Sequence, residues 1–259
     1  MDRQPTRRVI LLGASNLVRS ISTVVETARQ IWQEPVEIMA AIGHGRSYGQ
    51  DSRVLGRKIS GIFPCPLWKD LQIRPPLPTA ALVTDIGNDL GYGVPVARLV
   101  DWVEGCLDRL ERIQATTIIT QVPLESLARL SVRRYELFRQ ALFPSCSLRL
   151  TEIVALANEL NERLVALGEG RKISVIPVSG AWYGFDPIHL KRSTWQHAWP
   201  QILAAWRDGE QVSTVPRASF ARWAYLRSLA PAEHTLFGWP RRCAQPCGRL
   251  RDGTTISLY

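Results

Sequence analysis

Long hydrophobic runs are missing from this sequence of 259 residues, in which no window approaches the roughly 18 consecutive apolar residues of a membrane-spanning helix. The basic stretch 1–8 is followed by a short apolar run at 9–12, which is too short for the core of a signal peptide. Cysteines are few, five in all and widely spaced, so no disulfide framework is indicated. We therefore expect a soluble, cytoplasmic protein without a membrane span.

Lysine is scarce as well: it supplies only four of the 32 basic residues, and arginine supplies the rest. The formal net charge of +9 could attract nucleic acid, anionic lipid or an acidic ligand. Because the arginines are scattered along the chain, we expect no nucleic-acid partner. Hydrophobic residues at 46% and charged residues at 21% are typical of a globular protein and exclude a disordered chain.

Short β-branched runs alternate with longer amphipathic stretches. The runs predict five strands, at 9–12, 36–42, 80–86, 116–122 and 173–178. The amphipathic stretches predict helices at 16–32, 96–113, 134–143, 151–167 and 193–206. Apolar strands that alternate with helices indicate an α/β fold, a three-layer sandwich in which a five-stranded parallel sheet is covered on both faces. Ligands of such sheets bind beyond the carboxyl ends of the strands.

This predicted domain spans residues 1–208, and the segment 209–259 differs from it. The segment has three acidic residues and is broken by four prolines, while its aromatic residues argue against disorder. We expect an arginine-rich C-terminal extension that packs partly on the domain or on a partner. The alternative is that it binds an acidic partner or nucleic acid through Trp223, Trp239 and its arginines, Arg217, Arg222, Arg227, Arg241, Arg242, Arg249 and Arg251.

Four short polar segments follow predicted strands, at 13–16, 43–47, 87–89 and 186–189. Ser15 lies between a strand and a helix, where it is either an ordinary helix cap or a nucleophile beside the helix dipole. Asp186 lies three residues before His189, so its carboxylate can accept the Nδ1 proton and leave Nε2 as a base. The alternative is a surface turn. Among the other histidines, His44 remains a rival base.

Two further residues could bind a developing oxyanion. Asn88 carries a neutral amide donor, and Gly45 offers an unobstructed backbone N–H. Both could equally be turn residues. Four aromatic side chains flank the 186–189 segment and could line an acyl pocket or belong to the core, namely Trp182, Tyr183, Trp195 and Trp199.

The order and spacing of these segments over roughly residues 8 to 207 resemble the SGNH/GDSL hydrolase superfamily. The resemblance implies a flavodoxin-like sheet, a Ser15–His189–Asp186 triad and an oxyanion hole made by Ser15, Gly45 and Asn88. The sequence departs from the family's usual Gly-Asp-Ser at Ala14, which leaves the support of the nucleophile turn open. The glycine of the third segment, Gly87, is shifted by one position, and Gly43 competes with Gly45, which the spacing favours.

The function implied by this resemblance is a serine hydrolase, an esterase that cleaves a small-molecule carboxylic ester with an acyl or acetyl group. Ser15 would attack the carbonyl and His189 would take its proton, so neither a metal nor an organic cofactor is expected. The alternative is a catalytically inactive binding protein, or an acyltransferase that passes the acyl group to an acceptor alcohol.

Overall fold

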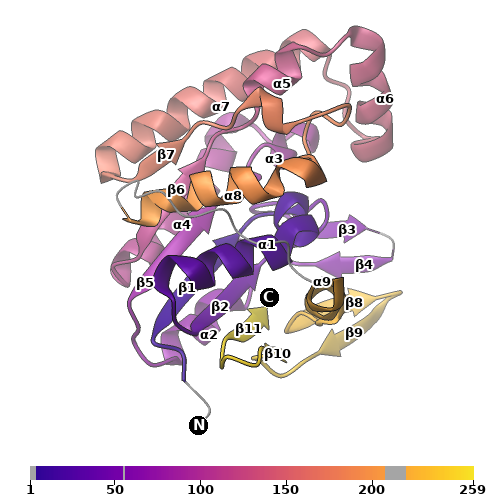
Figure 1. Cartoon of the computed structure of the whole chain (residues 1–259). Helices are drawn as coiled ribbons and strands as arrows, with labels where there is room; N and C mark the ends of the chain where they lie inside the picture. The colour runs from indigo at the N-terminus through magenta and orange to yellow at the C-terminus, as the bar shows by residue number, and fades with distance from the viewer. Residues whose placement is uncertain (1–3, 55, 208–219) are drawn as a thin grey trace.

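A computed structural model describes residues 4–54, 56–207 and 220–259, which fold around a mostly parallel central sheet (Figure 1). Its middle strands lie in the order β2-β1-β5-β6-β7 and all run parallel. Their bounds are β1 (Arg7–Leu12), β2 (Val36–Ala41), β5 (Thr79–Val83), β6 (Thr116–Thr120) and β7 (Ser174–Ile176). The five predicted strands and the α/β class are therefore confirmed, in the flavodoxin-like order.

The side chains of the sheet alternate between two hydrophobic cores. Val9 and Leu11 of β1 face one core, and Ile10 and Leu12 face the other, because successive side chains of a strand point to opposite faces. Helices α1 (Ser15–Trp32) and α8 (Trp195–Leu203) cover the first face and lie in front of the sheet in Figure 1. The opposite face is covered by α2 (Leu67–Ile73), α4 (Val96–Arg112) and α7 (Leu150–Arg171).

The remaining helices are short and lie near the carboxyl end of the sheet. They are α3 (Asn88–Gly91), α5 (Leu124–Ala128) and α6 (Val132–Leu142), with 3-10 turns at Gly180–Trp182 and Arg192–Thr194. A further 3-10 turn, Ala204–Arg207, follows α8 at the other end of the sheet, where Arg207 donates to the carbonyl of Ile31. None of the helices in the described ranges combines the length and the apolar character needed to cross a membrane.

The C-terminal segment adds strands that the sequence did not predict. Strand β11 (Thr255–Leu258) pairs in parallel with β2, and β10 (Gly248–Arg249) pairs antiparallel with β11, so the central sheet has seven strands. A second, four-stranded sheet joins the hairpin β3 (Ser52–Val54) and β4 (Arg57–Ile59) to β8 (Glu233–Leu236) and β9 (Trp239–Arg242). Figure 1 shows α9 (Phe220–Ser228) beside these strands.

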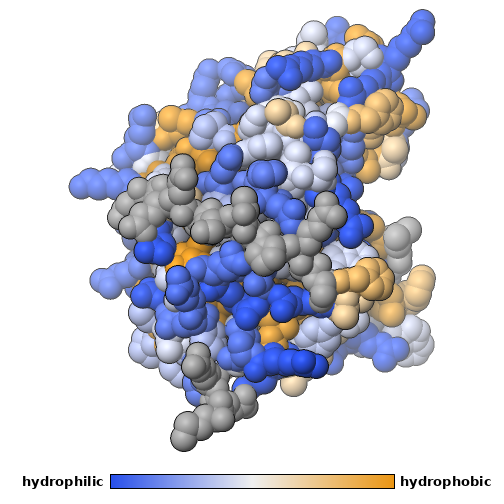
Figure 2. Space-filling model, viewed as in Figure 1, coloured by the Kyte–Doolittle hydropathy of each residue, from blue (hydrophilic) through white to orange (hydrophobic). Residues whose placement is uncertain are grey.

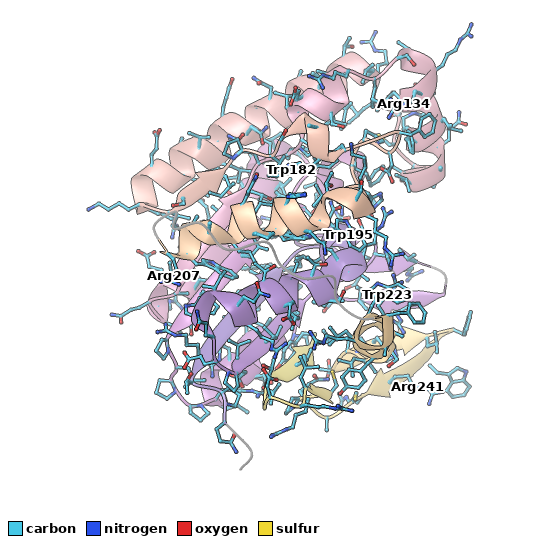
Figure 3. All side chains as sticks on the ribbon, in the orientation of Figure 1. Arg134, Trp182, Trp195, Arg207, Trp223 and Arg241 are labelled. Carbon is cyan, nitrogen blue, oxygen red and sulfur yellow. The ribbon has the colours of Figure 1, made fainter. Side chains whose placement is uncertain are left out.

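The arginines of this segment have different surroundings. Arg222 donates to Glu26 of α1 and so attaches α9 to the first helix, while Arg242 pairs with Glu233 at 3.3 Å. Arg227 lies over the ring of Trp223, which Figure 3 labels on α9. Arg217 lies outside the described residues.

Candidate active site

Three of the predicted site residues form one hydrogen-bonded chain. Ser15 is the first residue of α1, and its Oγ lies 2.7 Å from Nε2 of His189, which is 174 positions away. The Nδ1 atom of the same ring lies 2.5 Å from Oδ2 of Asp186. An ionised Asp186 favours the tautomer with the proton on Nδ1, which leaves Nε2 to accept the serine proton. The structure brings His189, and not the rival His44, to the hydroxyl.

The loop that carries the histidine is ordered by Asp186. Its Oδ1 accepts from the backbone N–H groups of Ile188 at 3.1 Å and His189 at 3.2 Å, while Oδ2 holds the ring. Partial burial raises the pKa of this carboxyl, but the hydrogen bonds and positive charge at His189 outweigh it and leave the pKa of Asp186 below its ordinary value. The Arg19 guanidinium lies 3.6 Å from the same carboxylate.

The turn before Ser15 is supported by Asp85, a residue that the sequence analysis did not single out. Its Oδ2 accepts from the N–H of Ala14 at 2.9 Å and from the N–H of Asn16 at 3.1 Å. A carboxylate from the end of the neighbouring strand β5 therefore holds the backbone on both sides of the serine. These two hydrogen bonds support the turn in which Ala14 replaces the aspartate usual in the family.

Asn16 joins this turn to the histidine loop. Its Nδ2 donates to Asp85 at 2.8 Å and to the carbonyl of Ile188 at 2.9 Å, and its Oδ1 accepts from the N–H of Leu190 at 2.8 Å. The Asn16 side chain thus connects the backbone on both sides of His189 to the carboxylate of Asp85. Ser15 and His189 are therefore held by a common set of contacts.

The prediction placed Asp85 inside a strand that extends to residue 86, whereas β5 ends at Val83. Asp85 has a left-handed backbone with φ of 58°, a conformation that aspartate tolerates better than most residues. The sequence signal that could have identified Asp85 is a lone acidic residue at the end of an apolar run. Burial raises the pKa of this carboxyl, and its hydrogen bonds with Asn16 and Ala14 oppose that shift.

The two candidate oxyanion residues follow β2 and β5, the strands on either side of β1. Gly45 follows β2 with φ of +58°, and its carbonyl accepts from the hydroxyl of Tyr92 at 2.7 Å. Asn88 begins α3, and its Nδ2 atom is buried without an acceptor among the described residues. Buried polar donors are normally paired, so an unpaired amide suggests a group that binds a ligand atom.

Asp89 connects the segments that contain these two residues. Its carboxylate accepts from the hydroxyl of Ser47 and, at 2.9 Å, from the N–H of Tyr48. Burial raises the pKa of Asp89 to about 6, although the hydrogen bonds from Ser47 and Tyr48 oppose the shift. The loop after β2 is therefore tied to the residue next to Asn88.

Asp89 should make stability fall with rising pH in the mildly acidic range. The folded state holds its proton up to about pH 6, whereas the unfolded chain releases it near the ordinary value of 3.8. The folded state then binds more protons between these limits, so we expect a loss of about 2 kcal/mol in unfolding free energy from about pH 4 to about pH 6. Urea unfolding across this range measures the loss.

Asp89→Asn is expected to remove most of this slope while keeping the side-chain shape. A wild-type unfolding free energy that stays flat between these pH values would contradict the assignment. Carboxyl NMR titration of the wild type measures the same pKa directly if the variant does not fold.

Arg134 of α6 holds the loop immediately before Asp186. Its Nε donates to the carbonyl of Phe185 at 2.8 Å and its Nη2 to the carbonyl of Gly184 at 2.6 Å, and its guanidinium lies 4.6 Å from the centre of the Phe185 ring. Figure 3 labels Arg134 on this helix, and Figure 2 shows hydrophobic side chains exposed over the same region. Asp186 is thus positioned from α6 as well as by its own loop.

Two cavities adjoin these residues. The first, of about 100 Å³, is bordered by Asn16, Asn88 and Ile188 and is otherwise mostly apolar. Of the four aromatic residues that flank the histidine, its lining includes Tyr183 and Trp199. The second cavity, of about 330 Å³, begins at Gly43 and His44 and extends toward the C-terminal segment.

Comparison with solved structures shows that the fold is shared with an aryl esterase, and it also finds weaker likenesses to another esterase and to a GDSL-like lipase. The aryl esterase of M. smegmatis has a TM-score of 0.54 at 13% identity, with 80% of this chain and 100% of that chain covered. A psychrotrophic esterase from Pseudoalteromonas sp. has a TM-score of 0.48 at 10% identity, over 78% of this chain and 98% of its own. A GDSL-like lipase from Bacteroides thetaiotaomicron has a TM-score of 0.49 at 11% identity, over 78% and 89%.

No protein-family model matches the chain, and no curated protein matches its sequence. The likeness therefore concerns the fold, an α/β fold with a mostly parallel sheet flanked by helices, as the resemblance implied. Any chemistry at Ser15 has to be argued from the geometry of Ser15, His189 and Asp186 in this chain.

Proposed function

We propose that the protein is a serine hydrolase that cleaves a carboxylic ester. The observation that carries the proposal is the unbroken chain of short contacts from Ser15 Oγ through the ring of His189 to the carboxylate of Asp186. A nucleophile, a base within hydrogen-bond reach and a third group that orients the base form the arrangement that acyl transfer requires.

In the proposed reaction, Ser15 Oγ attacks the ester carbonyl and Nε2 of His189 takes the hydroxyl proton. The C–O bond to the alcohol then breaks, and the protonated His189 returns that proton to the leaving alkoxide. Water, deprotonated by the same Nε2, attacks the acyl-enzyme and releases the acid and the free serine. Asp186 stays ionised throughout and stabilises the positive ring.

The negative charge of each tetrahedral intermediate would be bound by the N–H of Ser15, the N–H of Gly45 and the Asn88 amide. Ser15 opens an 18-residue helix, whose first turn presents backbone donors and the positive end of the helix dipole. The buried, unpaired Nδ2 of Asn88 supports its role as a donor.

Labelling with a fluorophosphonate and an intact-mass readout tests the proposal. We expect a single adduct on the wild type, no adduct on Ser15→Ala and much slower labelling of His189→Ala. A folded wild type that takes no adduct would overturn the proposal and favour a binding protein with this fold. If the serine labels, competition between water and candidate acceptor alcohols separates a hydrolase from an acyltransferase.

Asn88→Ala is expected to lower kcat by about 10²–10³, because one oxyanion donor is lost in the transition state. KM should change little, since the charge that this amide binds develops only after attack. Steady-state kinetics on any ester that the wild type cleaves provides the measurement. A loss of less than about threefold would remove Asn88 from the oxyanion hole.

A further inference from the structure

The second cavity lies between the hydrolase fold and the C-terminal segment. Its walls come from α1, the loop after β2, the hairpin β3–β4, α9, β8 and β11. Of these elements, β3, β4, α9 and β8 lie together at the right of Figure 1. Most of the lining is aliphatic, including Val18 of α1, Ile59 of β4, Leu226 of α9, Leu236 of β8 and Ile256 of β11. Its volume of about 330 Å³ is within the range of small-molecule sites.

The charge on this lining is of one sign. Arg57 and Arg227 both border the cavity, and no acidic residue does so within the described part of the chain. Neither arginine forms an ion pair with a described carboxylate, while Arg227 lies 5.1 Å from the ring centre of Trp223. Two cations beside an apolar wall indicate a ligand that is apolar over part of its length and anionic at one end.

Both arginines are held in place by ordered elements. Arg57 pairs with Leu236 across the β4–β8 ladder. Arg227 is on α9, which is attached to α1 by the Arg222–Glu26 contact and by the buried Leu226. The backbone positions of the two exposed arginines therefore depend on the C-terminal segment being docked.

His44 connects this cavity to the proposed catalytic residues. It lines the cavity, and its pKa is lowered by partial burial and then by the charges of Arg227, His189, Arg19 and Arg57. His44 belongs to the loop after β2 that also contains Gly45. On the other wall, Val18 lies one helical turn after Ser15.

We propose that this cavity binds the anionic end of the ester, a carboxylate or a phosphate carried on a short aliphatic chain, through Arg57 and Arg227. This assignment rests on the proposed hydrolase function and names its substrate class. Arginine presents a planar fork of donors that matches carboxylate and phosphate oxygens, and the aliphatic walls hold the chain between the anion and the scissile bond.

Binding is tested first with an inactive full-length chain, Ser15→Ala, because Ser15 does not line the cavity. The probes are hexanoate, hexyl phosphate and the neutral hexanamide, measured by calorimetry. We expect at least one anion to bind about tenfold or more tightly than the amide, as charge-assisted hydrogen bonds to arginine allow. The tighter of the two anions identifies the carboxylate or the phosphate as the group recognised.

Arg57→Gln and Arg227→Gln, alone and combined, should remove this preference. Arg53→Gln is the matched control, since Arg53 is an exposed arginine on the same hairpin and does not line the cavity. Loss of the preference in the control to the same extent would show that general surface charge, rather than the cavity, is responsible, and would overturn the proposal. Equal binding of anions and amide by the unaltered cavity would overturn it as well.

Kinetics on the active chain then separates the two proposals. Two matched pairs of esters are compared by kcat/KM: p-nitrophenyl hydrogen glutarate with its methyl ester, and p-acetoxybenzoate with its methyl ester. A preference of about tenfold for the charged member of either pair, lost in the double variant, supports the proposed substrate class. The pair that shows it identifies whether the acyl group or the leaving alcohol carries the anion. Cleavage of charged and neutral members at equal rates overturns it while the hydrolase stands.

If the chain cleaves no ester but still binds hexanoate or hexyl phosphate through the two arginines, the result contradicts the proposed hydrolase function and supports the anion site.

Discussion

Ser15→Ala and His189→Ala are each expected to reduce kcat on the order of 10⁶, because a triad loses nearly all of its advantage when either member is removed. The structure supplies the reason: the serine hydroxyl is 2.7 Å from Nε2 of His189, the ring nitrogen available to take its proton. Without the imidazole the hydroxyl stays protonated, and without the hydroxyl no acyl-enzyme can form. Steady-state rates on an activated ester measure both losses.

The double variant is the sharper test of a shared role. Residues that act as one unit are not additive, so Ser15→Ala combined with His189→Ala should lose about as much as either alone. His197→Ala is the matched control, an exposed histidine of α8 that should retain wild-type rates. Losses that multiply, or single losses below about tenfold, would mean that the two residues do not act together.

Asp186→Asn is expected to lower kcat by about 10⁴, the scale found when an amide replaces the orienting acid of a triad. The replacement keeps the shape but offers an N–H to the ring, so Nδ1 becomes the acceptor and Nε2 carries the proton toward Ser15. The base then faces the nucleophile in the wrong tautomer. Labelling by a fluorophosphonate should slow in parallel with ester turnover.

The same carboxylate gives a dependence of stability on pH that serves as an independent readout. The pKa of Asp186 is lower in the folded state than the ordinary 3.8, so its contribution is present above that value and is lost as the pH falls through the folded pKa. The difference in unfolding free energy between wild type and Asp186→Asn should therefore shrink below about pH 4.

The central strands were predictable because each carries its own signal. The apolar runs around Ile10 and Ile118 are buried on both faces, and such runs indicate parallel strands wherever they occur. Strand β11 has only four residues, Thr255–Leu258, at the lower limit of length for a strand pattern. What makes it a strand is its pairing with β2, and no local window contains that information.

The residues of the candidate site also include some that the sequence predicted and one that it did not. Ser15, Asp186 and His189 belong to short motifs whose residues lie close along the chain, so their order indicated their chemistry. Asp85 acts through contacts to Ala14 and Asn16 that cross between strand ends, and its backbone conformation is set by the turn it occupies. The distance of 71 positions between Asp85 and Ala14 explains why this support was not predicted.

The pairing of β11 with β2 also has a consequence for how the chain folds. The contact of Thr254 with Val36 closes a loop of 218 positions, which carries a high entropic cost and should make this pairing late. Until then β2, whose six residues are all buried in the native sheet, presents an open edge to other chains. Partly folded molecules should therefore associate through this edge during refolding at high concentration, and a chain cut at residue 208 should do so permanently.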